Sequence, residues 1–199
     1  MTLEELERHQ EVRFPQAFCR IYETGAMKWL TLTKDELKAR RQEYVNDSKA
    51  FLMLNCDCEM YLFEEIAQAS MTLAEWISWR EQDKGVKLRD GVKLVPFGHS
   101  CGGDIYCLLY SDDNNEPMVI KYSHDSYAPP TIEGHDLDEF VYIQLLLAAE
   151  NEEDVEGDNF TENMKYLSEK YLALVEGKDA DELTDDLYAL GVEQAEIWE

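Results

Sequence analysis

The sequence predicts an α+β fold, with an antiparallel sheet in the middle of the chain and helices before and after it. Three segments, near 92–96, 104–110 and 117–123, are rich in apolar, β-branched and aromatic residues. Only short stretches of turn-forming residues separate them, and strands joined by such short connections pair antiparallel as a meander. The segments on either side instead carry apolar residues at helical spacing.

Helix signals dominate the first fifty residues. Thr2 with Glu5, and Thr33 with Glu36, match the capping box, in which a hydroxyl and a carboxylate satisfy unpaired amides at a helix start. Between them, the segment 15–25 begins with proline, ends with glycine and places its apolar side chains on one face. We therefore expect three helices in this region, the last one reaching about residue 44.

The next part of the chain mixes strand and helix signals. Residues 29–32 predict a short strand, and the apolar, aromatic segment 50–66 predicts at least one buried strand. Thr72 with Glu75 matches a further capping box, so we expect a helix to begin there and to end at Gly85.

The C-terminal part begins with a helix that is apolar nearly all round. Asp136 and Glu139 are placed to cap it, and its composition predicts that it is buried. The composition changes near Glu150, which indicates a boundary between a domain at 1–150 and an acidic helical extension at 151–199. The apolar spacing within the extension predicts two short amphipathic helices.

The charge of the chain is strongly negative and unevenly distributed. The 199 residues include 43 acidic and 18 basic side chains, for a net charge of −25. Residues 1–50 hold nine of each, whereas residues 151–199 hold sixteen acidic and three basic side chains. Such a field disfavours nucleic acid and anionic membranes as partners, because both attract basic surfaces. A basic protein is the complementary partner.

Cysteine usage and the N-terminus favour a cytoplasmic location. The first residues lack the basic and apolar regions of a secretory signal. The longest uncharged apolar run, 140–149, is too short to span a membrane. The odd number of cysteines fits reduced thiols, and the five are Cys19, Cys56, Cys58, Cys101 and Cys107.

The stretch from Leu94 to Leu147 has a distinctive pattern of hydrophobic and turn residues, which includes Pro96, Gly102, Gly103, Asp104, Pro117, His124 and Asp125. In this pattern it resembles the SUKH superfamily, which includes cell-wall assembly regulators and many bacterial immunity proteins. The similarity extends over about 10–150. The resemblance implies a twisted, mostly antiparallel sheet flanked by helices. It also implies a non-enzymatic binding protein, and for the immunity proteins a toxin partner that is often a nuclease or a deaminase. From the residues themselves we expect no metal, nucleotide or other cofactor.

Other residue groups have both a functional and a structural interpretation. The glycine pair before Asp104 lacks the spacing and the lysine of a phosphate-binding loop, so we expect a tight strand start with Asp104 bonded to backbone amides. The cysteines at 56, 58 and 101 with His99 lack the paired spacing of a zinc site, so we predict no bound metal. Trp76 and Trp79 predict either core packing or, if exposed, a contact patch.

Two His-Asp pairs, His124-Asp125 and His135-Asp136, suggest general bases. Catalysis also needs a nucleophile and a group that stabilises negative charge, and this half of the chain is poor in cations. We therefore expect His124 to end a strand and Asp136 to cap a helix, and we expect no catalytic residues.

The acidic surface either aids solubility or binds a basic partner. We expect partner contacts at the residues Asp112, Asp113, Glu116, Asp125, Tyr127, Glu152, Glu153 and Asp154. Three functional hypotheses follow: an immunity-type protein that neutralises a basic toxin, a regulatory or scaffold protein of the cell-wall-regulator type, and an enzyme. The first accounts best for the combined features.

Overall fold

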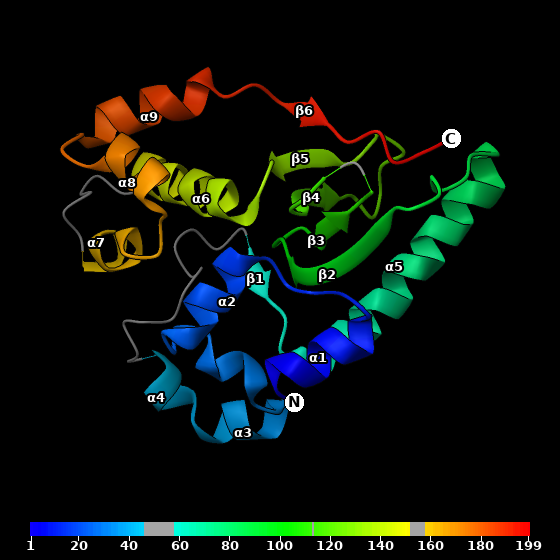
Figure 1. Ribbon diagram of the computed structural model, residues 1–199, viewed down its shortest axis with the longest axis horizontal. Coiled ribbons are helices and arrows are strands. Elements are labelled where there is room, and N and C mark those ends of the chain that lie inside the picture. Colours follow the sequence, from blue (N-terminus) through cyan, green and yellow to red (C-terminus); the bar gives the residue numbers. More distant parts are fainter. Residues whose placement is uncertain (46–57, 113, 152–157) are drawn as a thin grey trace.

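The computed structural model describes residues 1–45, 58–112, 114–151 and 158–199. Its centre is a six-stranded antiparallel sheet in which each strand pairs with its neighbour in the sequence (Figure 1). The strands are β1 (Glu59–Met60), β2 (Lys93–His99), β3 (Ile105–Tyr110), β4 (Met118–Tyr122), β5 (Thr131–Gly134) and β6 (Glu193–Gln194). Helices lie around the sheet, so the predicted α+β fold class is confirmed.

The helices come before, within and after the strands in the chain. They are α1 (Leu3–Gln10), α2 (Gln16–Glu23), the 3₁₀ helix η1 (Lys28–Thr31), α3 (Lys34–Ala39), α4 (Arg41–Val45), α5 (Phe63–Lys84), α6 (Leu137–Asn151), α7 (Asp158–Met164), α8 (Glu169–Val175) and α9 (Ala180–Ala189). Within the described ranges, none of these helices has both the length and the apolar character that crossing a membrane requires.

The predicted three-stranded meander is present as β2, β3 and β4. Val95 of β2 lies opposite Leu108 of β3, and Leu108 lies opposite Val119 of β4. The register of β2 shifts between Pro96 and Gly98. Gly98 is needed where it lies, because a Cβ there would be 2.8 Å from the carbonyl oxygen of Glu59 in β1.

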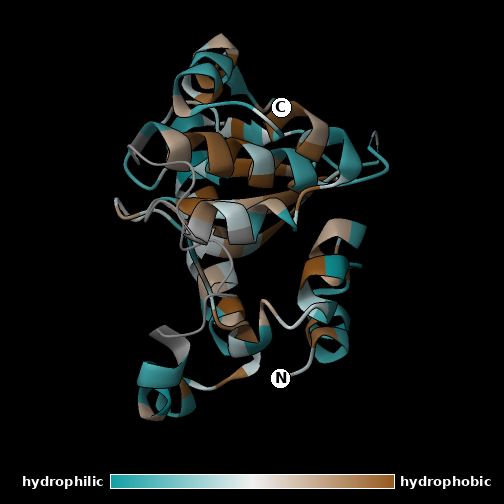
Figure 2. Ribbon diagram, turned by 90° about the vertical axis from the view of Figure 1, so that its left-hand side faces the viewer, coloured by the Kyte–Doolittle hydropathy of each residue, from teal (hydrophilic) through white to brown (hydrophobic). Residues whose placement is uncertain are grey.

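The strands separate two hydrophobic cores, because successive side chains of a strand point to opposite faces. Tyr106 and Leu108 belong to the larger core, together with α1, α2 and α6. Ile105 and Cys107 belong to the smaller core, which Leu73 of α5 and the C-terminal segment cover. Figure 2 shows hydrophobic residues along the strands and helices in the middle of the molecule and hydrophilic residues on the outer helices.

Several predicted helix ends are confirmed. Both capping boxes at the N-terminus form, with Thr2 and Glu5 at α1 and Thr33 and Glu36 at α3. The segment 15–25 contains α2, and Gly85 ends α5 with a left-handed backbone. At the start of α6, the Asp136 side chain accepts a hydrogen bond from the amide of Glu139, as expected.

Three local predictions are wrong. Residues 28–31 form a 3₁₀ helix rather than a strand, because the amides of Leu30 and Leu32 donate to carbonyl oxygens three residues earlier instead of to a neighbouring strand. Thr72 does not begin a helix, because α5 already starts at Phe63 and the Thr72 hydroxyl donates to the Gln68 carbonyl oxygen within it. The helix expected to reach residue 44 is divided into α3 and α4.

The segment 50–66 contains a strand, as expected, in the two-residue β1 with its buried Met60. The part of this segment before residue 58 lies outside the described residues.

The extension beyond residue 157 packs onto the rest of the chain. Leu183 of α9 is fully buried in the larger core, and Figure 1 shows α7, α8 and α9 around α6. β6 pairs with β5, and Ala195 and Ile197 enter the smaller core. The described part of the extension holds three helices rather than two, because residues 165–168 separate α7 from α8. The predicted boundary at residue 150 stays a prediction.

Candidate functional site

The predicted contact residues do not form one cluster. Asp112 and Glu116 are exposed in the turn between β3 and β4, whereas Asp125 and Tyr127 are exposed in the loop after β4. Because β4 runs between the two groups, they lie at opposite ends of the sheet, about 15 Å apart along the strand. The other four predicted contacts, Asp113, Glu152, Glu153 and Asp154, lie outside the described residues.

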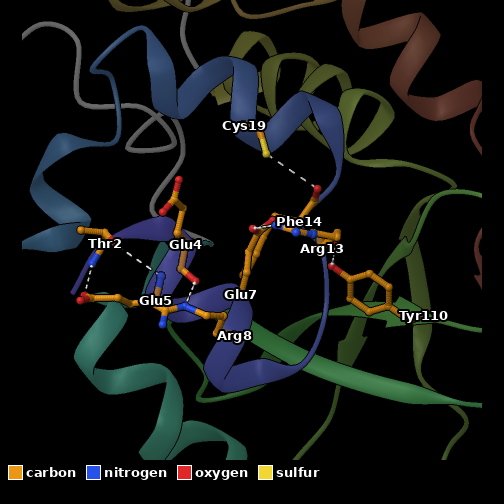
Figure 3. Close-up of polar contacts among 9 residues, drawn as sticks. All are labelled: Thr2, Glu4, Glu5, Glu7, Arg8, Arg13, Phe14, Cys19 and Tyr110. Atoms are coloured by element: carbon orange, nitrogen blue, oxygen red, sulfur yellow. Dashed lines mark hydrogen bonds and ion pairs between the residues drawn. The ribbon is translucent and has the colours of Figure 1, made fainter.

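A polar network holds the end of the sheet that carries the β3–β4 turn (Figure 3). The buried carboxylate of Glu7 accepts a hydrogen bond from the Arg13 guanidinium at 2.6 Å and one from the Phe14 amide at 3.0 Å. The Tyr110 hydroxyl of β3 donates to the Arg13 carbonyl oxygen at 2.8 Å. These bonds connect α1 and the segment between α1 and α2 to the sheet, so the polar groups at this end are engaged in holding the fold together.

The opposite end of the sheet contains a pocket of about 210 Å³, which we call the Trp79 pocket. Its walls come from α5 and from the end of β4 with the loop that follows, and the lining residues are Trp76, Trp79, Arg80 and residues 122–127. Two large aromatic side chains at this pocket are mainly in solvent, Trp79 at 63% and Tyr127 at 57% exposure. Two of the predicted contacts, Asp125 and Tyr127, thus lie in one concave surface.

Of the two tryptophans of α5, one packs against neighbouring rings and the other is exposed, as a contact residue would be. Trp76 is half-buried, with its ring centroid 6.4 Å from that of Tyr122 and 5.9 Å from that of His124. Trp79 instead projects into solvent beside the pocket. Trp76 is a packing residue, and Trp79 has the exposure that a contact residue requires.

Arg80 fixes the loop that carries Asp125 and Tyr127. This guanidinium is buried, donates to the carbonyl oxygens of Tyr127 at 2.6 Å and Ala128 at 3.0 Å, and lies 4.7 Å from the ring centre of Trp198. The Lys84 ammonium lies 3.9 Å from the ring centre of Tyr127. The loop is therefore attached to α5, and the exposed aromatic residues keep a defined relative position.

His124 pairs with Asp104 at the start of β3, not with its neighbour in the sequence. The Asp104 carboxylate accepts a hydrogen bond from the His124 amide at 3.2 Å and lies 3.0 Å from the His124 Nδ1 atom. Partial burial opposes ionisation, but the bonds from His124 outweigh it and lower the pKa of Asp104. The expected bond from Asp104 to a backbone amide is thus confirmed, as is the glycine-dependent turn, since Gly103 has a φ of 91°.

A metal ion has one geometrically suitable position among the described residues. Asp104, His124 and Asp125 offer ligand atoms within 4.8 Å of one another. The hydrogen bonds of Asp104 with His124, and one from Ser123 to Asp125 at 3.0 Å, already account for this arrangement. The cysteines considered above for zinc do not belong to this group: Cys58 is buried in the core, and Cys56 lies outside the described residues.

A second and larger pocket of about 480 Å³ lies next to the first, and we call it the Tyr61 pocket. One wall is a face of α5 with Glu64, Glu65, Gln68, Ala69, Thr72 and Trp76, and the other comes from Tyr61, His99, Gly103 and Ile105, with Lys34 at the side. The ring centroids of Tyr61 and His99 are 5.2 Å apart. Burial raises the pKa of Tyr61 to about 12, so its hydroxyl stays protonated. Trp76 lines both pockets.

The lining of the Tyr61 pocket was not predicted from the sequence. The available signal is the spacing of Glu64, Gln68, Thr72 and Trp76, which follow one another four residues apart and therefore share one helix face. The incorrect helix start at Thr72 concealed it. For Arg80, no pattern in the sequence indicates its bonds to a loop 47 residues away.

The two pockets form a concave surface with aromatic walls and carboxylates, which suits a cationic or aromatic group of a partner. Comparisons of this chain with protein families, with curated proteins and with solved structures give no match.

Proposed function

We propose that this protein acts by binding a basic protein partner, as an immunity-type protein that neutralises a toxin domain without chemistry of its own. The residues similar to the SUKH superfamily motivate the choice of partner. The charge supports it, because residues 101–199 hold 26 acidic and four basic side chains. A nuclease or deaminase toxin must be basic to hold its phosphate-bearing substrate, so the two surfaces are complementary.

One observation carries the proposal: the exposed pair Trp79 and Tyr127 beside the Trp79 pocket, with Asp125 in the loop wall of the same pocket. Tryptophan and tyrosine dominate the energetic centres of protein interfaces, where they supply a large contact area at a low entropy cost. Their attachment through Arg80 means that little ordering is needed on binding. Asp112 and Glu116 remain predicted contacts, about 15 Å from this centre.

The test is an inhibition and binding assay with a purified basic toxin domain encoded next to this chain. We expect excess protein to abolish toxin activity, and we expect the association rate to fall as salt rises, because salt screens charge attraction. Trp79→Ala should weaken binding by about 30-fold or more, mainly through faster dissociation.

A matched control is Met71→Ala, because Met71 is 61% exposed on the same helix and lines neither pocket. It should leave the affinity unchanged. A toxin that stays fully active in excess protein contradicts the proposal, and so does an association rate that is indifferent to salt. The regulatory or scaffold function would then be the remaining hypothesis.

A further inference from the structure

We propose that the Tyr61 pocket receives an arginine side chain of the partner, in a position where Lys34 now supplies the cation. The inference rests on the proposed function and extends it from a charged surface to one specific anchor. Its volume of about 480 Å³ lies within the range of pockets that enclose a ligand group.

The carboxylates of Glu64 and Glu65 define the charge of this pocket. Both belong to the first turn of α5, and Glu65 Oε1 lies 2.8 Å from the Lys34 Nζ atom. Glu64 accepts a hydrogen bond from the Lys34 backbone amide at 2.7 Å. The first turn of a helix carries about half a positive charge, which two full negative charges outweigh. A cation is therefore favoured here, although the helix dipole alone would oppose it.

Lys34 marks the place of the cation but is weakly held. Its side chain is 71% exposed, so water screens its ion pair with Glu65 and a solvent-separated state costs little. The hydrogen bond to Glu65, followed by the attraction of the Glu65 charge, raises the pKa of Lys34. A partner cation with additional contacts can replace it.

The aromatic walls favour arginine over lysine. A planar guanidinium stacks on aromatic rings and bonds to carboxylates through several N–H groups at once, whereas an ammonium is a compact, strongly hydrated charge. Tyr61, His99 and Trp76 supply rings on both sides of the pocket. Because Trp76 also lines the Trp79 pocket, an arginine here would lie next to the exposed aromatic pair.

The test uses the full chain and a small probe, acetyl-arginine amide, titrated while NMR follows the indole N–H of Trp76. The neutral isostere acetyl-citrulline amide is the ligand control. We expect a saturable shift with the arginine probe and about tenfold weaker binding of the citrulline probe, because bonds to a charged group are worth at least 1.5 kcal/mol. Equal binding of the two probes would overturn the proposal.

Variants give the second arm of the test. Glu64→Gln should weaken the arginine probe by about tenfold, whereas Glu75→Gln, an exposed change on the same helix, should leave it unchanged. Lys34→Gln should strengthen binding of the arginine probe by removing the competing cation, whereas Lys38→Gln, also on α3, should leave it unchanged. Both pocket variants leave the Glu65 carboxylate that accepts from the Leu62 amide, so the helix start is preserved.

Weaker binding in Lys34→Gln, or no loss in Glu64→Gln, would also refute the inference. Because this titration contains no partner protein, its failure is distinguishable from failure of the proposed function. In that case Trp79→Ala would still weaken the toxin complex, while the arginine probe would not bind.

Discussion

The substitution Ile197→Ala tests whether the C-terminal segment is a structural part of the sheet domain. Ile197 is 1% exposed in the smaller core, and its segment pairs antiparallel with residues 87–89. Its carbonyl oxygen accepts from the Arg89 amide at 2.9 Å, and two further bonds join Lys87 with Glu199 at 2.7 and 2.8 Å. The backbone therefore holds the side chain in place, and the site cannot collapse easily after truncation.

The magnitude follows from the atoms removed. The change deletes three buried carbon atoms, and at about 0.8 kcal/mol for each the transfer contribution is about 2.4 kcal/mol. The remaining cavity adds to this value, so we expect a loss of about 2.5 to 4 kcal/mol in the free energy of unfolding. For a domain of marginal stability this is a large share of the total.

Urea unfolding followed by tryptophan fluorescence measures the effect. Val192→Ala is the matched control, since Val192 is 85% exposed in the same segment and should change stability by less than about 0.5 kcal/mol. A loss below about 1 kcal/mol for Ile197→Ala, or equal losses for the two variants, would show that the segment does not complete the core.

Two further predictions concern the region where β5 meets α6. The hydrogen bond to Glu139 is the main cause of a raised pKa of His135, so protonated His135 stabilises the fold below about pH 6.5, and this contribution disappears as the pH rises through the folded-state pKa. Between about pH 6 and pH 8, the free energy of unfolding should therefore fall more for the wild type than for His135→Gln. Equal decreases would contradict the assignment. Gly134→Ala should destabilise by about 1 to 3 kcal/mol, because its Cβ would lie 2.6 Å from the Phe140 amide nitrogen, whereas Gly191→Ala has no atom within 4 Å and should be neutral; thermal melts that rank them in reverse would refute the packing argument.

The parts of the fold predicted from the sequence are those in which local signals agree with tertiary packing. The three central strands have period-two or continuous apolar patterns and clear turns, and both N-terminal capping boxes stand at true helix starts. β1, β5 and β6 have two to four residues each, too few to show a period. Their pairing depends on neighbours distant in the sequence. Similarly, Thr-x-x-Glu occurs inside α5 as easily as at its start, so Thr72 gave a false helix boundary.

The candidate site shows the same division. Asp125 and Tyr127 could be selected because they follow a predicted strand in an exposed loop, and they do line one pocket. Asp112 was selected because it belongs to an acidic turn that projects between two predicted strands. The predicted meander already implies that Asp112 lies far from Asp125, because residues before and after one strand lie at opposite ends of a sheet. The contacts of Arg80 could not be predicted, since they depend on how α5 lies against the sheet. Glu64 had a signal in its four-residue spacing with Gln68, Thr72 and Trp76, but the wrong helix start at Thr72 concealed this shared face.

The charge of this protein and its pockets come from different parts of the chain, and this separation has a mechanistic consequence. The pocket residues Glu64, Glu65 and Trp79 belong to residues 51–100, which hold eight acidic and five basic side chains. The largest excess of negative charge instead belongs to the extension. Charge acts over about 8 Å at physiological salt and mainly affects encounter, while desolvated aromatic contacts determine how long a complex lasts. Neutralising acids of α9, such as Asp185, should therefore slow association, whereas changes at Trp79 should speed dissociation. One surface that supplied both effects would show the two rates changing together in every variant, and that result would contradict the division of roles.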